Sequence, residues 1–522
     1  MTEFAVARHV SELLPYLLHS GRSYEARLTV PAHAAAPRPT SQYTPASAIS
    51  ARQLGESELS YYLPSRGNGV NDMYLHLGFR APPHSVRRER VRIIWATLRA
   101  RHPLLTSKVV MLDYDDVSFE CNRRSPKDEL VDAESNLEYR ISTKDELINS
   151  YLNGPRTLSD NRLSYLILSQ NVSSPSDFDF LLCTTHFIGD GMSLHQFAND
   201  FLHLLGSDMT DRELEVGLYL EWQKRMVKNS PALPAPLDSS FPTESRLRRA
   251  ALDVDFKRNE EKQLGGHAFT RRSAHTRHTV TRVVSFDPDR TKAILQRCKS
   301  HGVSVSAALF AICNLAWIRM TPNKAELPAL FYSALNMRPY VPPRDSYWFL
   351  AVGFFNVILP NFLPTSADEA SVFWARARSA KEQSMRAAKS PLLISRTRRT
   401  ATERAQRSRA WAKEDDDKER GIFVPPPSAT GGQPNARAPS TALMGLSLLG
   451  NLDSTYKHAT FSDIKLHTLT TGSRQRPGSL LLFGYTFAGK LWISLGYDEN
   501  GLDKDMVEAF WQQCLRATDN FL

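Results

Sequence analysis

The segment 178–193 constrains the fold of this chain more than any other, because it predicts a buried strand, a tight turn and a helix in direct succession. An apolar run at 178–183 follows a Ser-Ser-Pro-Ser turn and is typical of a buried strand. After the turn, apolar residues recur at helical spacing (Leu194, Phe197, Phe201, Leu204 and Leu205), and we expect Ser193 to be the N-cap. The segment therefore delivers His186 to the end of a buried strand.

The spacing His-x-x-x-Asp between His186 and Asp190 is weak by itself. With 15 histidines in 522 residues, roughly one such pair is expected by chance. Gly191 directly after the aspartate, the strand before the turn and the helix behind it make the combination specific. Proton transfer by a single histidine is the chemistry that this placement favours.

Other sites fit the segment less well. A zinc site would need His186 and Asp190 on one helical face, but Gly189 and Gly191 each disfavour a helix by roughly 1 kcal/mol. No cysteine or histidine cluster with ligand spacing stands nearby, so we expect no metal. A serine nucleophile elbow fails because 191–195 ends in histidine where glycine is required. A buried histidine bonded to backbone carbonyls remains the structural alternative.

At 522 residues the chain is too long for one core, and we expect two domains. We predict a flexible leader at 1–50, a first domain at 51–229 and a second at 279–522. A charged, proline-containing crossover joins them at 230–278, and the proline- and glycine-rich stretch 421–441 predicts a mobile loop.

The coarse element order alternates strands and helices and predicts an α/β fold. We expect strands at 72–80, 107–112, 117–122, 163–170, 329–336, 354–360, 480–485 and 490–497, and helices at 84–101, 288–300, 304–317 and 502–517. Ser366 and Glu369 have the spacing of a capping box, which predicts a helix from there to about residue 387.

The net charge of +10 invites a nucleic-acid partner, but its placement argues against one. Six arginines fall within 396–409, directly before the acidic stretch 414–417, and such a mixed-sign run is typical of a solvated helix face or a mobile loop. No apolar stretch reaches the ~20 residues of a membrane span. The five scattered cysteines indicate buried thiols in a reducing compartment, and we expect a cytoplasmic protein.

Several segments together carry a resemblance to a known family. They are 101–105 (Arg-His-Pro-Leu-Leu), the motif at 185–191, the helix at 304–317, Asn-Met-Arg-Pro at 336–339, Gly-Phe-Phe-Asn at 353–356, 445–451 and 496–498. The chain resembles the His-x-x-x-Asp acyltransferase superfamily, which includes chloramphenicol acetyltransferase, plant BAHD acyltransferases, condensation domains and fungal O-acetyltransferases. It is most similar to fungal trichothecene-type O-acetyltransferases.

Two departures narrow the resemblance. The Asp-Phe-Gly-Trp-Gly box of plant BAHD enzymes is absent, and the nearest match is 482–485. Condensation domains carry two adjacent histidines, whereas Thr185 stands in the first of these positions. Both departures fit the fungal alcohol acyltransferases and disfavour a donor bound to a carrier protein.

The resemblance implies an α/β fold of two chloramphenicol-acetyltransferase-like domains, each a mixed sheet flanked by helices, with an active-site channel between them. It implies that His186 is the general base. Asp190 and Gly191 would support the turn, with Asp190 paired to Arg338. By the same resemblance, the candidates for contacts with the substrate or its oxyanion are Thr185, Asn336 and Ser447. His195 and His203 are expected to be packing or surface residues.

The expected function is transfer of an acetyl group from acetyl-CoA, or of another acyl group from acyl-CoA, to a hydroxyl of a terpenoid or polyketide-type secondary metabolite. CoA thioester and alcohol are both substrates, and no tightly bound cofactor, nucleic acid or membrane span is expected. We expect a monomer. Two alternatives stay open: a carrier-protein-dependent, condensation-type acyltransferase, and a non-catalytic member of the superfamily that binds a metabolite or partner.

Overall fold

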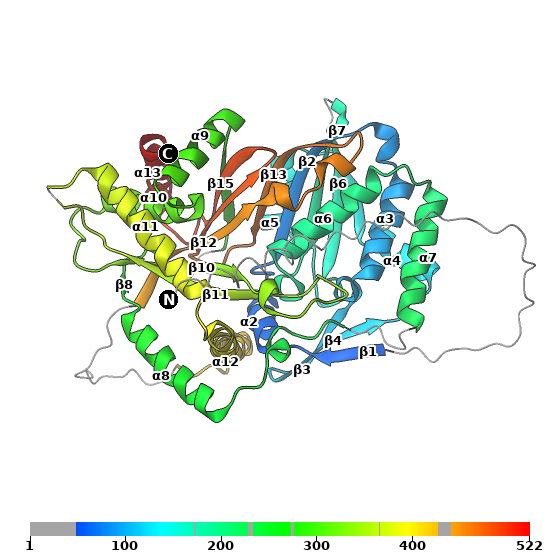
Figure 1. Cartoon of the computed structure of the whole chain (residues 1–522). Coiled ribbons are helices and arrows are strands. Elements are labelled where there is room, and N and C mark those ends of the chain that lie inside the picture. The colour runs from blue at the N-terminus through cyan, green and yellow to red at the C-terminus, as the bar shows by residue number, and fades with distance from the viewer. Residues whose placement is uncertain (1–48, 172–173, 228–232, 273–275, 365, 426–439) are drawn as a thin grey trace, which may run out of the picture. The chain divides into compact units, whose positions relative to one another are not determined.

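The strand that leads into His186 lies inside a five-stranded sheet of order β13-β2-β7-β6-β5 (Figure 1). The computed structural model describes residues 49–171, 174–227, 233–272, 276–364, 366–425 and 440–522. The strands of this sheet are β2 (Met73–Arg80), β5 (Leu137–Arg140), β6 (Ser164–Asn171), β7 (Ser174–Thr184) and β13 (Lys465–Ser473). Only β5 and β6 pair in parallel, so the sheet is mixed.

Strand β7 is buried on both faces, which explains its nearly continuous apolar sequence. On one face, Phe180 and Leu182 join a core with helices α3 (Arg88–Arg101) and α6 (Gly191–Leu205). On the other face, Leu181 and Cys183 pack with helix α5 (Lys144–Asn153). The histidine that follows is thus held at the end of a buried strand that is paired on both sides.

A second mixed sheet has seven strands, in the order β11-β10-β12-β14-β15-β9 with β8 paired to β12. Its strands are β8 (Gly265–Gly266), β9 (Thr279–Phe286), β10 (Ala329–Asn336), β11 (Val352–Leu359), β12 (Ser440–Asn451), β14 (Leu480–Phe487) and β15 (Lys490–Asp498). Its core includes residues of α9 (Pro288–Ser300), α10 (Val305–Met320), α11 (Glu369–Ala388) and α13 (Lys504–Phe521). Helix α10 is apolar on every face and buried along most of its length, as such a helix must be.

The remaining elements are a small sheet and the helices around it. The sheet has the order β1-β4-β3, with β1 (Ile49–Gln53), β3 (Lys108–Asp113) and β4 (Asp116–Asn122). The helices are α2 (Glu56–Ser65), α4 (Pro126–Ser135), α7 (Asp211–Val227), α8 (Arg246–Lys262) and α12 (Leu393–Glu419). The strands and helices expected from the sequence are present, and the two mixed sheets with their helices confirm the α/β class.

Two segments of the second half of the chain lie against the first half. Strand β13 pairs with β2 over its whole length, from Lys465 opposite Arg80 to Ser473 opposite Met73. Helix α12 packs beside α2, where Ser408 Oγ donates to the carbonyl of Ser60 (3.3 Å). The first sheet is therefore completed by residues from the predicted second domain, and the division at 230–278 stays a prediction.

Two predicted helix caps are wrong. Helix α6 is capped by Asp190, whose Oδ1 accepts from the backbone amides of Met192 (3.0 Å) and Ser193 (3.3 Å), because the helix already begins at Gly191. Ser193 lies inside the first turn. Helix α11 is capped by Asp368, which accepts from the amide of Ser371 (3.0 Å), and not by Ser366.

The arginine-rich run 396–409 belongs to helix α12, and only one of its sides is solvated. Small residues on the other side are buried: Ala401, Ala405, Ser408 and Ala412. The predicted crossover at 230–278 holds α8 and β8. Residues 1–48 of the predicted leader and 426–439 of the predicted loop lie outside the described residues.

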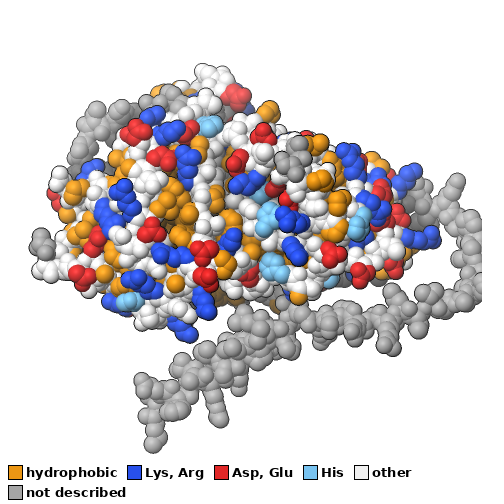
Figure 2. Space-filling view, turned by 90° about the horizontal axis from the view of Figure 1, so that it is seen from above, with side chains coloured by type: hydrophobic (Ala, Val, Ile, Leu, Met, Phe, Trp, Pro, Cys, Tyr) orange, Lys and Arg blue, Asp and Glu red, His pale blue; other side chains and the backbone are white. Residues whose placement is uncertain are grey.

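Charges of both signs are interspersed on the face seen in Figure 2 and form no single basic stripe there. All five cysteines are free and buried. Within the described ranges no single helix has the length and apolar character for a bilayer span; α9 and α10 reach them only as a pair bent by 91°. The same ranges hold no group of three or more His, Cys, Asp or Glu side chains that could bind a metal ion.

Candidate functional site

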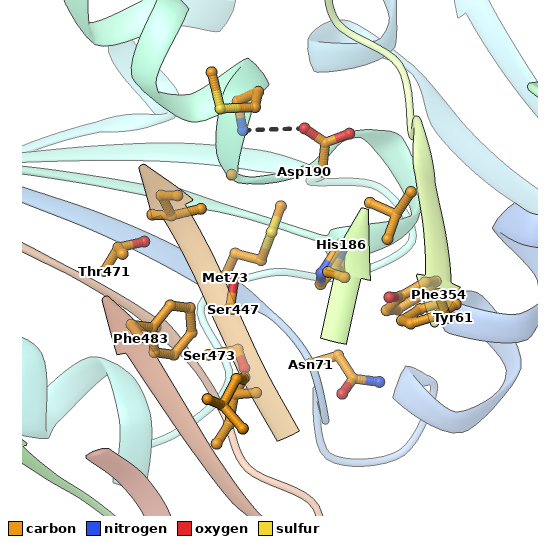
Figure 3. A pocket seen from close by; sticks show the side chains of 18 of the residues that line it. Tyr61, Asn71, Met73, His186, Asp190, Phe354, Ser447, Thr471, Ser473 and Phe483 are labelled. Carbon is orange, nitrogen blue, oxygen red and sulfur yellow. Dashed lines mark hydrogen bonds between the residues drawn. The ribbon is translucent and has the colours of Figure 1, made fainter. Parts of the chain in front are cut away.

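A cavity of about 440 Å³ lies where the two large sheets meet, and His186 and Asp190 are in its wall (Figure 3). The first sheet contributes residues of β2, β13 and the turn after β7, and the second contributes residues of β10, β11, β12 and β14. Most of the wall is apolar, from side chains such as Met73, Phe354 and Phe483.

Strand register explains why these segments meet. Met73 at the start of β2 pairs with Thr184 at the end of β7 on one side and with Ser473 at the end of β13 on the other. The residues just beyond these strand ends, His186 and Arg476, therefore come to the same edge of the sheet. Both line the cavity.

The imidazole of His186 is held in one orientation. Its Nδ1–H donates to the carbonyl oxygen of Gly189 (3.1 Å), and the ring of Tyr61 stacks on it at a centroid distance of 4.1 Å. A carbonyl oxygen only accepts, so the neutral ring carries its proton on Nδ1 and its lone pair on Nε2. Nε2 is the atom that can take a proton from a molecule in the cavity.

Burial lowers the pKa of His186 below the usual value of an imidazole, because the charged form loses solvation. The nearby carboxylate of Asp190 opposes this shift, and the guanidinium of Arg404 adds to it. His186 is therefore neutral at pH 7 and competent as a base.

Both oxygens of the Asp190 carboxylate accept hydrogen bonds from the protein itself. The carboxylate caps helix α6, and its Oδ2 accepts from the amide of Ala351 (2.9 Å). Figure 3 shows the dashed bond from Asp190 to a helix amide, on the side away from His186.

Arg338 lies opposite Asp190. Its Nη1 is 2.7 Å from Oδ1 and 2.8 Å from Oδ2 of the carboxylate. Its Nη2 donates to Ser193 Oγ (2.7 Å) and to the carbonyl of Phe349 (2.8 Å). The pair ties the start of α6 to the segment before β11, so it connects the two sheets beside the cavity.

The two glycines of the turn differ in whether a larger side chain would fit at their positions. A Cβ added at Gly191 would meet only Leu449 Cδ2, at an ordinary 3.5 Å. A Cβ added at Gly189 would lie 3.1 Å from Trp348 Nε1 and 3.3 Å from the side chain of Ser193. Close packing at the turn therefore requires glycine more at Gly189 than at Gly191.

The three candidates for substrate or oxyanion contacts do not lie together. Thr185 is fully buried and outside the cavity wall, and its hydroxyl has no hydrogen-bond partner among the described residues. Asn336 and Ser447 do line the cavity. The Oδ1 of Asn336 accepts from the amide of Arg338 (3.0 Å), which leaves its NH₂ group to a ligand.

Of the two histidines on α6, His203 is exposed. His195 is fully buried and its Nδ1 is 2.9 Å from the hydroxyl of Tyr456. Both positions agree with packing or surface roles.

Sequence reasoning missed most polar residues of the cavity, among them Tyr61, Tyr332, Arg404 and Arg476. Arg404 belongs to the run interpreted as solvated, and that interpretation is wrong for this residue. The buried stripe of small residues on α12 recurs every three or four positions and was the signal for a packed face. No comparable local signal marks Arg476, which follows β13.

No protein-family model matches the chain, and comparison with curated proteins finds no match. Solved structures do match. TRI3 trichothecene 15-O-acetyltransferase from Fusarium sporotrichioides superposes with a TM-score of 0.70 at 13% identity, over 90% of this chain and 94% of that one. The epimerization domain from the third module of tyrocidine synthetase B has a TM-score of 0.54 at 13% identity, over 91% and 98%.

The condensation domain of the Monacolin K polyketide synthase MokA has a TM-score of 0.54 at 11% identity, over 90% of this chain and 97% of that one. These likenesses cover nearly the whole of each protein. The chain therefore shares the fold of these three proteins, an α/β fold of two chloramphenicol-acetyltransferase-like domains.

Proposed function

We propose that this protein is an acyl-CoA-dependent O-acyltransferase with His186 as its general base. The observation that supports this most is the free Nε2 of a neutral, stacked imidazole in the wall of a mainly apolar cavity. The likeness in fold to an O-acetyltransferase agrees with it.

The reaction needs no covalent intermediate on the enzyme. His186 Nε2 takes the proton from the acceptor hydroxyl as its oxygen attacks the thioester carbonyl carbon. The tetrahedral oxyanion then collapses, the carbon–sulfur bond breaks, and the CoA thiolate leaves with the proton from Nε2. The hydroxyl of Ser447 and the NH₂ group of Asn336 are the described side-chain donors that we assign to the oxyanion or the acceptor.

Asp190, Gly191 and Arg338 support the turn in this proposal and do not touch the reacting atoms. We assign acetyl-CoA as donor and a hydroxyl of a terpenoid or polyketide-type metabolite as acceptor, because the wall of the cavity is mostly apolar. Buried free thiols support a cytoplasmic enzyme, and we propose that it acts as a monomer.

Release of free thiol tests the proposal. We expect acetyl-CoA with a panel of sesquiterpene, diterpene and polyketide alcohols to yield thiol, and His186→Ala to reduce the rate by about 10²–10⁴-fold without loss of the folded state. His203→Ala, exposed on the helix that follows, is the matched control. Full activity of His186→Ala would overturn the mechanism.

The same assay separates the alternatives. Turnover only with an acyl group loaded on a carrier protein would favour a condensation-type enzyme, the class to which several solved structures of this fold belong. Binding of a metabolite with no thiol release from any donor would identify a non-catalytic protein.

A further inference from the structure

Two arginines from distant parts of the chain face the active-site cavity. Arg404 comes from the middle of α12, and Arg476 comes from the segment after β13. The one acidic residue among the cavity's described lining, Asp190, is already paired with Arg338. The lining therefore carries two positive charges that it does not neutralise.

Neither arginine has a carboxylate partner in the part of the chain that the structure describes. Among the described residues, no ion pair or hydrogen bond is formed by the side chain of Arg404 or Arg476, and Nε of Arg404 is buried without any partner. By contrast Arg409, little more than one turn further along α12, pairs with Glu56 at 2.9 Å and with Asp115 at 2.6 Å. Acidic partners are therefore present elsewhere along α12, and the lack of one for Arg404 is specific to the cavity.

The guanidinium of Arg404 is nevertheless held in place. It lies over the ring of Phe354 at 4.4 Å and over the ring of Tyr61 at 5.3 Å. Aromatic faces attract the cation but accept no hydrogen bonds in the plane of the guanidinium, so its N–H groups are not satisfied by these rings. Tyr61 also stacks on His186, so Arg404 and the base share one aromatic side chain.

The surroundings of Arg476 disfavour its charged form. Burial lowers the pKa of Arg476, and the nearby charge of Arg404 lowers it further. Like charges that are partly desolvated cost free energy unless an anion compensates them. An anionic ligand supplies that compensation, and a neutral ligand does not.

The position of Arg404 excludes the phosphates of CoA as its partner. Its guanidinium is no farther from the imidazole than the Arg404–Tyr61 and Tyr61–His186 distances taken together. A thioester that reacts beside His186 is separated from the CoA diphosphate by the whole pantetheine arm, which is longer than that. An anion bound by Arg404 would therefore lie close to the reacting atoms.

We propose that Arg404 and Arg476 form a carboxylate-binding subsite, so that one of the two substrates carries a carboxylate near the reacting group. The inference rests on the proposed function and narrows its substrate class. The carboxylate belongs either to the acceptor, which is then a hydroxy acid, or to the acyl group, in which case the donor is a dicarboxylic monothioester of CoA in place of acetyl-CoA. Paired N–H groups of guanidinium match the two oxygens of such a group.

Binding to the full chain carrying His186→Ala tests the subsite without turnover. The probes are terpenoid and aromatic hydroxy acids, each matched with its own methyl ester, and malonyl-CoA matched with acetyl-CoA. We expect at least one acid to bind about 10- to 100-fold more tightly than its neutral counterpart, the range of charge-assisted hydrogen bonds. An acid–ester difference assigns the carboxylate to the acceptor, and a malonyl–acetyl difference assigns it to the acyl group.

In the chain that carries His186→Ala, Arg404→Gln and Arg476→Gln should each bring the affinity for the acid closer to the affinity for its neutral counterpart, so that the ratio of the two approaches one. Arg407→Gln, exposed on the same helix, is the matched control and should leave the ratio unchanged. Because Arg404 packs between two rings, Arg476→Gln is the variant that decides if Arg404→Gln fails to fold.

Equal binding of acids and neutral counterparts across the panel would overturn the subsite, as would a preference that survives both substitutions. Absence of binding by every acid counts against it as well. Selective binding of acids by a protein that releases no thiol with any donor would contradict the proposed function and leave the subsite standing.

Discussion

Two pairs of charged residues meet at the same cavity and differ in what satisfies them. Arg338 and Asp190 satisfy each other and also bind Ser193 and backbone groups. Arg404 and Arg476 are like charges with no acidic partner among the described residues. An arginine whose Nη groups are bound by the protein maintains structure, whereas a pair without acidic partners among the described residues can bind an anionic ligand.

The two pairs should differ most in how much a single substitution in each lowers the free energy of unfolding. Arg338→Ala and Asp190→Asn should each lower the free energy of unfolding by about 3–5 kcal/mol, because each leaves a buried charge or buried donors without a partner. Arg476→Gln should change it by less than about 1 kcal/mol in either direction, because it removes a charge that the protein does not compensate. Denaturant unfolding monitored by circular dichroism measures all three.

The comparison breaks if Arg338→Ala keeps its stability and loses only turnover. Asp190 would then belong to the chemistry, and its pair with Arg338 could no longer be assigned to structure alone.

Acid should destabilise the folded protein through His195, which is buried on the helix that Asp190 caps, whereas arginines do not titrate in this range. Burial lowers the pKa of His195 to about 3. Between that value and the usual imidazole pKa of about 6.5, the unfolded chain binds a proton that the folded protein does not. Stability should therefore fall as pH drops below 6.5, by about 2 kcal/mol from this one residue at pH 5.

Unfolding measured at pH 7 and at pH 5 checks this contribution. In His195→Gln the loss between the two values should be smaller by about 2 kcal/mol, whatever the stability of the variant at pH 7. His203→Gln, on the exposed side of the same helix, is the matched control.

The smallest expected effect is on the pH dependence of turnover. The pKa of His186 is lowered by burial, so the base is already deprotonated below the usual imidazole range. Between pH 7 and pH 6, kcat/KM should fall less than the roughly threefold drop of an unperturbed imidazole. A steeper fall would show that His186 gains a proton near neutrality and adds a third positive charge to the cavity.

Local sequence predicted the elements around His186 well. Strand β7, the turn and α6 follow from apolar runs and glycines within sixteen residues, and the register of β2 and β7 then fixes where the histidine lies. The cap of α6 was misplaced by three residues, because Asp190 and Ser193 are both good caps and only the start of the helix decides between them.

The other side of the cavity could not be predicted in this way. Arg404 stands in a helix whose composition indicates solvent exposure, and it lines the cavity because α12 packs against α2. Arg476 reaches the cavity because β13 pairs with a strand almost 400 residues earlier in the chain. Both placements depend on contacts between distant segments, and periodicity within one segment carries no information about them.

The pairing of β13 with β2 also determines when the first sheet can be completed during synthesis of the chain. While the chain is synthesised, β2 has to wait for residues 465–473 with one edge unpaired, and an unpaired edge invites aggregation. Arg476 leaves the ribosome only after that strand. A nascent chain that stops before β13 lacks both the closing strand and one of the two cavity arginines, so the cavity is complete only near the end of translation.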